Sequence, residues 1–297
     1  MNENHRILIT GSNGLLGNKL SNQLQKKKID FLATSLGENR NKGISTSNYN
    51  SLDITDKNEI EKVIKQFKPT HVIHSAALTN VDFCENNQEL CTRVNVNGTK
   101  YLFDICAYFG IHFLLLSTDF VFDGQKGNYS EDDPRNPLSI YAKSKVDAEN
   151  LLINSDYKNW SIVRTIILYG KAENLSRGNL VLWAKEALKS QTQMKVIDDQ
   201  FRAPTWADDL AWACIKICEL NEVGVFHISG PETYSILEIV HKIAEYYNYS
   251  TECIESVDTQ TLNQSAKRPP RTGFDLTKAK LRLGYSPMSL NETLAFI

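Results

Sequence analysis

The chain has 297 residues, of which 41% are hydrophobic and 23% charged, with a formal net charge of -2. A chain of this length and composition can bury a full core without disulfides, as one large domain or two unequal ones. The charges are interspersed and leave no basic stripe for a phosphate backbone, and no apolar run approaches the roughly 18 residues of a membrane helix. We therefore expect neither nucleic-acid binding nor membrane insertion.

The six cysteines include no Cys-x-x-Cys pair, and the six histidines are scattered without ligand spacing. We expect buried, reduced thiols and no metal site. The first residues, MNENHRILITG, run directly into a strand pattern, with no basic segment followed by an apolar stretch. This start predicts a cytoplasmic protein.

From the first residue to about Thr165, short apolar runs alternate with longer segments of helical period. The predicted strands are Arg6 to Thr10, Asp30 to Thr34, His71 to Ser75, His112 to Ser117 and Ser161 to Arg164. The predicted helices are Leu15 to Lys26, Asp56 to Phe67, Gln88 to Phe109 and Ser139 to Ile153. The alternation is typical of an α/β fold with a doubly wound parallel sheet of the Rossmann type.

Beyond Thr165 the pattern loosens into short strands and three further helices. The segments predicted here are helices at Asn179 to Lys189, Trp206 to Leu220 and Ile236 to Tyr246, and a strand at Val225 to Ile228. We predict a dinucleotide-binding domain over residues 1–165 and a smaller substrate-binding region over 166–297, part of which returns to the main sheet. The Asn-rich stretch from Asn39 to Asn50 is predicted to be a surface loop.

A glycine-rich turn, ITGSNGLLG, joins the first predicted strand to the next helix. Its three glycines allow a tight turn, a close approach of a pyrophosphate to the backbone, and close packing of the helix on the sheet. The free N–H groups and partial positive charge of the helix N-terminus favour a phosphate there. The residues predicted to bind a nicotinamide dinucleotide at this turn are Gly11, Asn13, Gly14, Leu15, Leu16 and Gly17.

The end of the second predicted strand indicates which dinucleotide is bound. An acidic residue at this place accepts the adenosine 2'-hydroxyl and disfavours a 2'-phosphate. Here the strand ends at Ser35 without a carboxylate, and Arg40 follows. Ser35 and Arg40 can hold a phosphate by hydrogen bonding and charge, which favours NADPH and leaves NADH as the alternative. Asp53, with Ile54 beside it, is a candidate for the adenine edge or a turn aspartate.

Tyr141 and Lys145 are four residues apart at the start of a predicted helix and therefore project from one face. A phenol has an ordinary pKa of about 10, and an ammonium one turn away lowers that pKa and can also bind the cofactor ribose. Such a pair can protonate a carbonyl oxygen during reduction. Ser117 and Thr118 end the preceding strand where open parallel sheets bind ligands, and a hydroxyl there can steady an alkoxide.

With these residues identified, the chain resembles an extended short-chain dehydrogenase/reductase, and specifically the dTDP-4-dehydrorhamnose reductase family. The resemblance covers nearly the whole length. The motifs that carry it are GSNGLLG at Gly11 to Gly17, AALTNVDFCE at Ala76 to Glu85, STDFVFDG at Ser117 to Gly124, YAKSK at Tyr141 to Lys145, DQFRAPTWADDLA at Asp199 to Ala211 and RPPRTGFDLTKAKLRLG at Arg268 to Gly284.

The resemblance implies NADPH-dependent reduction of the 4-keto group of dTDP-4-dehydro-6-deoxy-L-mannose, giving dTDP-L-rhamnose. It implies Thr118, Tyr141 and Lys145 as the catalytic set and places the backbone of Ala76 and Ala77 beside the cofactor. The residues implied to bind the nucleotide-sugar are Thr79, Val81, Asp82, Phe120, Arg202 and Arg268, with the arginines able to pair with its diphosphate.

The sequence departs from the family pattern at Phe120, where tyrosine is common, and at Ala142, where glycine is usual. Phe201 and Arg202 also replace a smaller pair of residues. These differences concern the identity of the sugar more than the chemistry.

Two alternatives remain open. One is another nucleotide-sugar enzyme on the same scaffold, an epimerase or a dehydratase; a dehydratase needs a carboxylate beside Thr118, for which Asp119 is available. The other is a non-catalytic, cofactor-binding role, because the beta regulatory subunit of methionine adenosyltransferase is similar to this family. The retained Tyr141 and Lys145 favour an enzyme. The predicted helices Gln88 to Phe109 and Ser139 to Ile153 are candidates for packing against a second copy of the chain in a homodimer.

Overall fold

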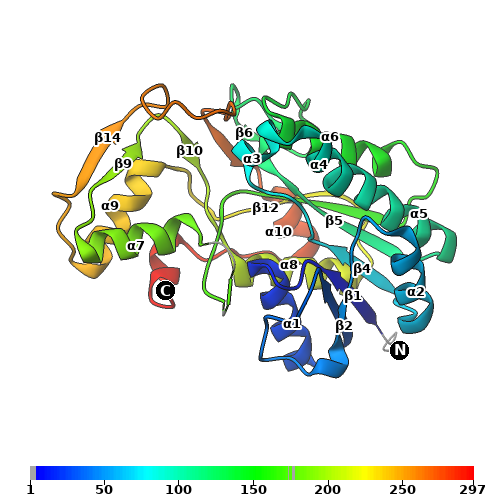
Figure 1. Ribbon diagram of the computed structural model, residues 1–297. Coiled ribbons are helices and arrows are strands. Elements are labelled where there is room, and N and C mark those ends of the chain that lie inside the picture. The colour runs from blue at the N-terminus through cyan, green and yellow to red at the C-terminus, as the bar shows by residue number, and fades with distance from the viewer. Residues whose placement is uncertain (1–4, 173, 176–177) are drawn as a thin grey trace.

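The computed structural model describes residues 5–172, 174–175 and 178–297 and is built around one seven-stranded sheet (Figure 1). The strand order is β12-β7-β5-β4-β1-β2-β3, and every neighbouring pair is parallel. The strands are β1 (Arg6–Thr10), β2 (Asp30–Ser35), β3 (Tyr49–Ser51), β4 (His71–His74), β5 (His112–Thr118), β7 (Trp160–Thr165) and β12 (Gly224–Ile228). The predicted doubly wound Rossmann-type sheet is confirmed.

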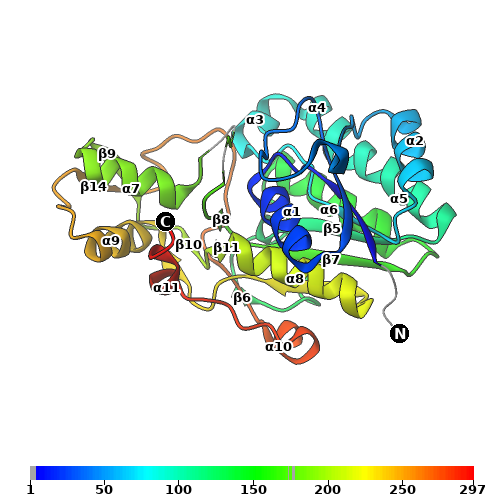
Figure 2. The same ribbon diagram turned by 90° about the horizontal axis from the view of Figure 1, so that it is seen from below.

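Helices cover both faces of this sheet (Figure 2). On one face lie α1 (Leu15–Lys27), α8 (Ala207–Leu220) and α10 (Thr277–Leu283), and on the other lie α2 (Lys57–Phe67), α5 (Thr99–Phe109) and α6 (Ile140–Ile153). Side chains of a strand alternate between faces, so Ile7 and Ile9 pack with Leu20 of α1, whereas Leu8 packs with Ile64 of α2. The buried strands therefore read as continuous apolar runs, as in parallel sheets generally.

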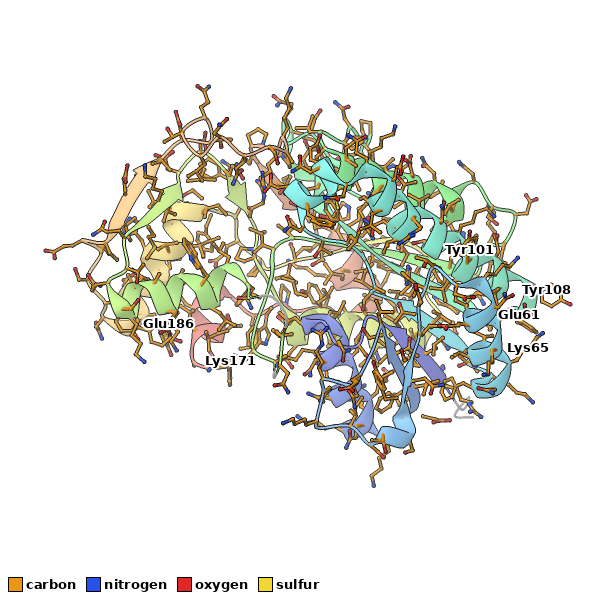
Figure 3. All side chains as sticks on the ribbon, in the orientation of Figure 1. Glu61, Lys65, Tyr101, Tyr108, Lys171 and Glu186 are labelled. Carbon is orange, nitrogen blue, oxygen red and sulfur yellow. The ribbon has the colours of Figure 1, made fainter. Side chains whose placement is uncertain are left out.

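The outer surfaces of α2 and α5 face solvent on the side of the molecule away from the C-terminal part (Figure 3). Glu61 and Lys65 form an ion pair of 2.5 Å one turn apart on α2, and Tyr108 at the end of α5 is 83% exposed. These side chains lie on the outer faces of α2 and α5, and the inner faces of both helices pack in the core.

The strand order reverses between β1 and β4. The chain runs from β1 outward to β3 in one direction, and then from β4 outward to β12 in the other. The loops after β1 and β4 therefore diverge, and such a switch point opens a crevice at the carboxyl edge of the sheet where ligands bind. Gly11 and Ala76 lie in these two loops.

The C-terminal part of the chain forms a smaller lobe at the left of Figure 1. It contains α7 (Leu180–Ser190), β9 (Met194–Ile197), α9 (Ile236–Tyr247), β14 (Ile254–Val257) and α11 (Leu290–Leu294). Val181, Val196, Ile239 and Leu294 belong to its own apolar cluster. Within this part of the chain, β12 and α8 instead join the main sheet layer, where β12 pairs with β7 and α8 packs on α1.

Short elements complete the described chain. They are η1 (Thr46–Asn48), α3 (Val81–Asn86), η3 (Asp119–Val121), β6 (Gly127–Tyr129), β8 (Leu168–Tyr169), β10 (Phe201–Arg202), β11 (Thr205–Trp206), β13 (Tyr234–Ser235) and β15 (Thr272–Phe274). Among the described residues, no helix has the length and apolar character needed to cross a bilayer.

The stretch from Asn39 to Asn50, predicted as a surface loop, has regular secondary structure at its end. Residues 46–48 form η1, and Tyr49 begins β3, which pairs with β2 in the register Ala33 to Tyr49. A three-residue polar edge strand shows no apolar alternation, because its stability comes from backbone pairing rather than from buried side chains.

The helix predicted over Gln88 to Phe109 is interrupted. It consists of α4 (Gln88–Thr92), a π-helical segment η2 (Arg93–Gly98) and α5. Asn95 lies in the π-helical segment and is 1% exposed. Its amide accepts from Leu78 N at 2.8 Å and donates to Ser144 Oγ at 3.0 Å. The wider turn thus brings a polar side chain between the loop after β4 and α6, consistent with the frequent occurrence of π-bulges at functional sites.

Candidate active site

A cleft of about 900 Å³ lies at the carboxyl edge of the sheet, between the loops after β1, β2, β4 and β5 and residues of the C-terminal part. Its volume is in the range of sites that bind cofactors and substrates. The predicted site residues that line it are Gly11, Asn13, Gly14, Leu15, Leu16, Gly17, Ser35, Arg40, Asp53, Ile54, Ala76, Ala77, Thr79, Val81, Thr118, Phe120, Tyr141 and Lys145. Asp82, Arg202 and Arg268 do not line it.

The glycine turn has the geometry that a pyrophosphate needs. Gly11 has φ 75°, and a Cβ there would lie 2.7 Å from Ala76 N. A Cβ on Gly17 would overlap the Gly11 carbonyl oxygen. Gly14 is the N-cap of α1 and leaves the first turn without a side-chain cap, so its N–H groups are free to bind an anion. The chain therefore fits a dinucleotide at this place.

The loop after β2 is held against the glycine turn by Asn13. Its amide donates to Glu38 O at 2.8 Å, and its oxygen accepts from Arg40 N at 2.8 Å. Ser35 ends β2, and the exposed Arg40 side chain lines the same cleft. No carboxylate lies at the end of β2 itself. The first cationic residue after β2 in the sequence is Arg40, as predicted.

Asp53 has the geometry of a turn aspartate and also lines the cleft. Its Oδ1 accepts from Thr55 N and Thr55 Oγ1, both at 2.8 Å. Ile54 packs against Gly98 of the π-helical segment, where an added Cβ would lie 3.1 Å from Ile54 Cδ1. Contact of Asp53 with an adenine stays a prediction.

Thr118, Tyr141 and Lys145 meet where β5 ends and α6 begins. Ser139 caps α6 by accepting from Ala142 N at 3.3 Å, which fixes the first turn that carries Tyr141. All three side chains are at least nine-tenths buried yet line the cleft. Thr118 Oγ1 donates to Asp119 Oδ1 at 3.0 Å. A reacting carbonyl in this part of the cleft would lie beside hydroxyl, phenol and ammonium groups.

Burial determines the titration of Tyr141 and Lys145. It raises the pKa of Tyr141 above its ordinary value, a rise that the Thr118 hydrogen bond opposes and the Asp119 charge adds to. Burial also lowers the pKa of Lys145 to about 8, against the attraction of Glu149. The net shift of the Tyr141 pKa is therefore opposite to the predicted lowering, and the contribution of Lys145 to it stays a prediction. Tyr141 packs among apolar side chains, and Lys145 Nζ donates to Leu116 O at 2.6 Å.

The predicted arginines of the substrate side are paired within the protein. Arg202 is 2% exposed; it donates to Pro269 O at 2.5 Å and lies 3.7 Å from Asp119. Arg268 binds Asp82 through two hydrogen bonds of 2.5 and 3.3 Å. Sequence reasoning expected both arginines to face the substrate, whereas here internal carboxylates and carbonyls hold them. Their contact with substrate stays a prediction.

Several buried residues near the site were missed by sequence reasoning. Asn95 joins the loop after β4 to α6, and His74 bridges Thr10 and Thr99 at 2.7 and 3.1 Å. Glu149 accepts from Ser117 Oγ at 2.6 Å. For Glu149 a signal existed, because it follows Lys145 by one helical turn on an otherwise buried face. In the ranges that the structure describes, no group of three or more His, Cys, Asp or Glu side chains is placed to hold a metal ion.

Comparison with known proteins agrees with this geometry. The sequence pattern of the RmlD substrate binding domain matches residues 5–297. The chain belongs to this family. The chain is also similar to a dTDP-4-dehydrorhamnose reductase of Aggregatibacter actinomycetemcomitans, with 31% identity over 97% of both chains. The family assignment confirms the resemblance drawn from the motifs.

Other relatives of this RmlD-family chain carry two different names. The crystal structure of a dTDP-4-dehydrorhamnose reductase from Bacillus anthracis str. Ames, in complex with NADP, has a TM-score of 0.85 and 28% identity, covering 98% of this chain and 97% of that one. Methionine adenosyltransferase 2 subunit beta of Bos taurus is 27% identical over 93% of this chain and 81% of its own length. The predicted reductase and the regulatory alternative thus both have relatives of this chain.

Proposed function

We propose that this protein uses NADPH to reduce the 4-keto group of a dTDP-4-dehydro-6-deoxy sugar, giving dTDP-L-rhamnose from dTDP-4-dehydro-6-deoxy-L-mannose. The observation that carries the proposal is that Thr118, Tyr141 and Lys145 line the same cleft as the Gly11 to Gly17 turn. The relative that shares 31% identity over nearly its whole length is a dTDP-4-dehydrorhamnose reductase. A phosphate-binding turn and a proton donor in one cleft are what a keto-sugar reductase requires.

Each residue of the cleft has a separate proposed role in the reaction. The N-terminus of α1 and the glycine turn would hold the pyrophosphate, and Ser35 with Arg40 would hold the 2'-phosphate. A relative is described in complex with NADP. NADPH supplies a hydride when it is bound. Tyr141 donates its phenolic proton to the oxygen of the substrate carbonyl, and Thr118 orients that oxygen. The raised pKa of Tyr141 keeps this proton in place throughout the neutral range.

Lys145 supports this step by its charge. Its ammonium, fixed by Leu116 O, lies one turn of α6 after Tyr141 and stabilises negative charge that develops on the phenol oxygen. The same ammonium is proposed to bind the nicotinamide ribose, so Lys145 serves both cofactor binding and proton transfer.

We also propose, from the residues that line the cleft, that the chain divides at residue 165 into a dinucleotide-binding domain and a substrate-binding region. Ile167, Leu168, Asn179 and Leu210 of the later part complete the cleft, which supports a substrate-binding role for residues 166–297. Within this part, Arg202 and Arg268 would bind the sugar diphosphate only if its oxygens replaced their present partners within the protein. A cytoplasmic location and a homodimer stay predictions.

The test is NADPH consumption by the purified protein with a panel of dTDP-4-keto sugars, and identification of the product. We expect turnover with dTDP-4-dehydro-6-deoxy-L-mannose and a 4-hydroxy product. Binding of NADPH without turnover of any keto-sugar would overturn the proposal and favour the regulatory role named for the methionine adenosyltransferase relatives. A dehydratase is less compatible with the site, because the Asp119 carboxylate is engaged by Thr118, Thr272 and Arg202.

A further inference from the structure

Glu149 is a fully buried carboxylate on α6, one helical turn after Lys145. Its Oε1 accepts from Ser117 Oγ at 2.6 Å and from Arg164 Nε at 2.9 Å. Its Oε2 accepts from Arg164 Nη2 at 2.7 Å and from Arg135 Nη1 at 2.9 Å. Burial alone would raise the pKa of this carboxyl, but the arginines and Ser117 outweigh burial and lower it. A negative charge is therefore held at a fixed point inside the protein.

This charge lies on the face of α6 that also carries Lys145. Residues four apart on a helix are neighbours, so the Glu149 carboxylate acts on the Lys145 ammonium at close range. Solvent does not screen the pair, because Lys145 is 4% exposed and Glu149 has no exposed surface. Burial drives Lys145 toward its neutral form, and the attraction of Glu149 opposes it.

The other groups that face Lys145 do not supply a comparable charge. On β5, the Leu116 carbonyl oxygen accepts the hydrogen bond that Lys145 donates. On β4, Lys145 faces His74, whose pKa burial lowers to about 3 so that the ring is neutral. From α4 it faces the Cys91 thiol, which is hydrogen-bonded to Ser144. On α6 itself the remaining titratable neighbour is Tyr141, which keeps its proton.

We propose that Glu149 is a positioning residue that keeps Lys145 protonated at the cleft, and that Arg135 and Arg164 set how strongly it does so. The inference rests on the proposed function of Lys145 in keto-sugar reduction. Arg164 joins Glu149 to β7, and Arg135, which also donates to Asn150 Oδ1 at 2.8 Å, joins it to the loop before α6. The network thus fixes both the position of α6 and the charge beside Lys145.

The direct test is the side-chain titration of Lys145, followed by NMR of ¹³C-labelled lysine and assigned by the signal lost in Lys145→Met. In Glu149→Gln the hydrogen-bonding shape is retained and the negative charge is removed. We expect the Lys145 pKa to fall by about one unit, a tenfold change in proton affinity. The alkaline limb of turnover should move to lower pH by the same amount.

Arg135→Gln provides the opposite perturbation. Its side chain is 21% exposed, and its loss removes a positive charge while Arg164 still holds Glu149. We expect the Lys145 pKa and the alkaline limb to move upward. A loosened fold would not lower the Lys145 pKa in Glu149→Gln and raise it in Arg135→Gln. This pair of variants therefore distinguishes an electrostatic role of Glu149 from a merely structural one. Arg135→Gln also decides the matter if Glu149→Gln does not fold.

Ser117→Ala serves as the matched control, because it removes one hydrogen bond to Glu149 and leaves the carboxylate charge. We expect a lower melting temperature with a Lys145 titration close to that of the parent. The inference is overturned if Glu149→Gln and Arg135→Gln leave the Lys145 pKa unchanged, or if both lower it. Absence of keto-sugar turnover in the parent would overturn the proposed function instead, since the NMR titration needs no turnover.

Discussion

The ammonium of Lys145 donates a 2.6 Å hydrogen bond to the main-chain carbonyl oxygen of Leu116, so a buried cation on α6 is fixed to the end of β5. This bond directs the positive charge to the strand edge where Thr118 begins the next turn. It also explains how a lysine stays beside Tyr141 although burial disfavours its charge. The site is therefore built on the electrostatics of Lys145 rather than on an acidic phenol.

The first prediction concerns pH. Burial depresses the pKa of Lys145 from 10.5 to about 8, so the ammonium is present below pH 8 and is lost as pH rises through that value. If the ammonium is required, turnover should fall above pH 8, tenfold for each further unit. Lys145→Met should show low turnover without this limb. A limb at the ordinary phenol or lysine pKa of about 10 would contradict the assignment.

The second prediction concerns the glycine turn. Gly14 has φ -82°, and a Cβ there would lie 3.3 Å from Gly11 O, so a side chain can be accommodated with a small adjustment. In Gly14→Asp the new carboxylate becomes an N-cap for α1, which favours the helix, but it repels the pyrophosphate. We expect unchanged or higher thermal stability and NADPH binding weakened at least about tenfold, or ~1.4 kcal/mol. Gly14→Ala is the control, and equal NADPH affinity in Asp and Ala variants would refute this placement.

The third prediction concerns cofactor choice. Arg40 is exposed, and the Asn13 contact holds its backbone rather than its guanidinium, so Arg40→Ala leaves the loop in place. We expect NADPH binding to weaken by about 1.5–3 kcal/mol, with little change for NADH. Lys42→Ala removes a nearby charge that does not line the cleft and should change neither affinity. Equal losses for both dinucleotides in Arg40→Ala would show that Arg40 does not read the 2'-phosphate.

The fourth prediction concerns the proton donor. In Tyr141→Phe the ring stays in its cluster with Cys84 and Cys91, and only the phenol oxygen is lost. We expect kcat to fall at least about 100-fold, as for other positioned proton donors, with NADPH affinity nearly unchanged. Tyr108→Phe, at an exposed position on α5, should behave as the parent does. Parent-like turnover in Tyr141→Phe would remove Tyr141 from the mechanism.

Much of the fold could be predicted because the sheet strands are short apolar runs separated by helices of clear period. β1 has the predicted ends, and Asp56, predicted as the first residue of a helix, caps α2 by accepting from Asn58 N and Glu59 N. β3 could not be predicted, because an edge strand of three polar residues is defined by pairing with β2 and not by its side chains. The π-helical turn around Asn95 likewise depends on tertiary contacts.

The site was predictable where a motif has a local geometry, as in the glycine turn and the Tyr141 and Lys145 pair. It was not predictable where partners come from distant segments. Arg268 is held by Asp82, 186 positions away, and Arg202 is paired with Asp119. Burial is also a tertiary property, so the raised pKa of Tyr141 could not follow from its spacing to Lys145.

The central claim, that this cleft transfers hydride to carbon 4 of a keto-sugar with Tyr141 as proton donor, is tested most directly by isotope transfer. The parent protein would be given NADPH deuterated at the reactive nicotinamide carbon together with dTDP-4-dehydro-6-deoxy-L-mannose. The account predicts dTDP-L-rhamnose carrying one deuterium at carbon 4, formed at a greatly reduced rate by Tyr141→Phe. Tight binding of the cofactor with no deuterium in any sugar product would contradict it.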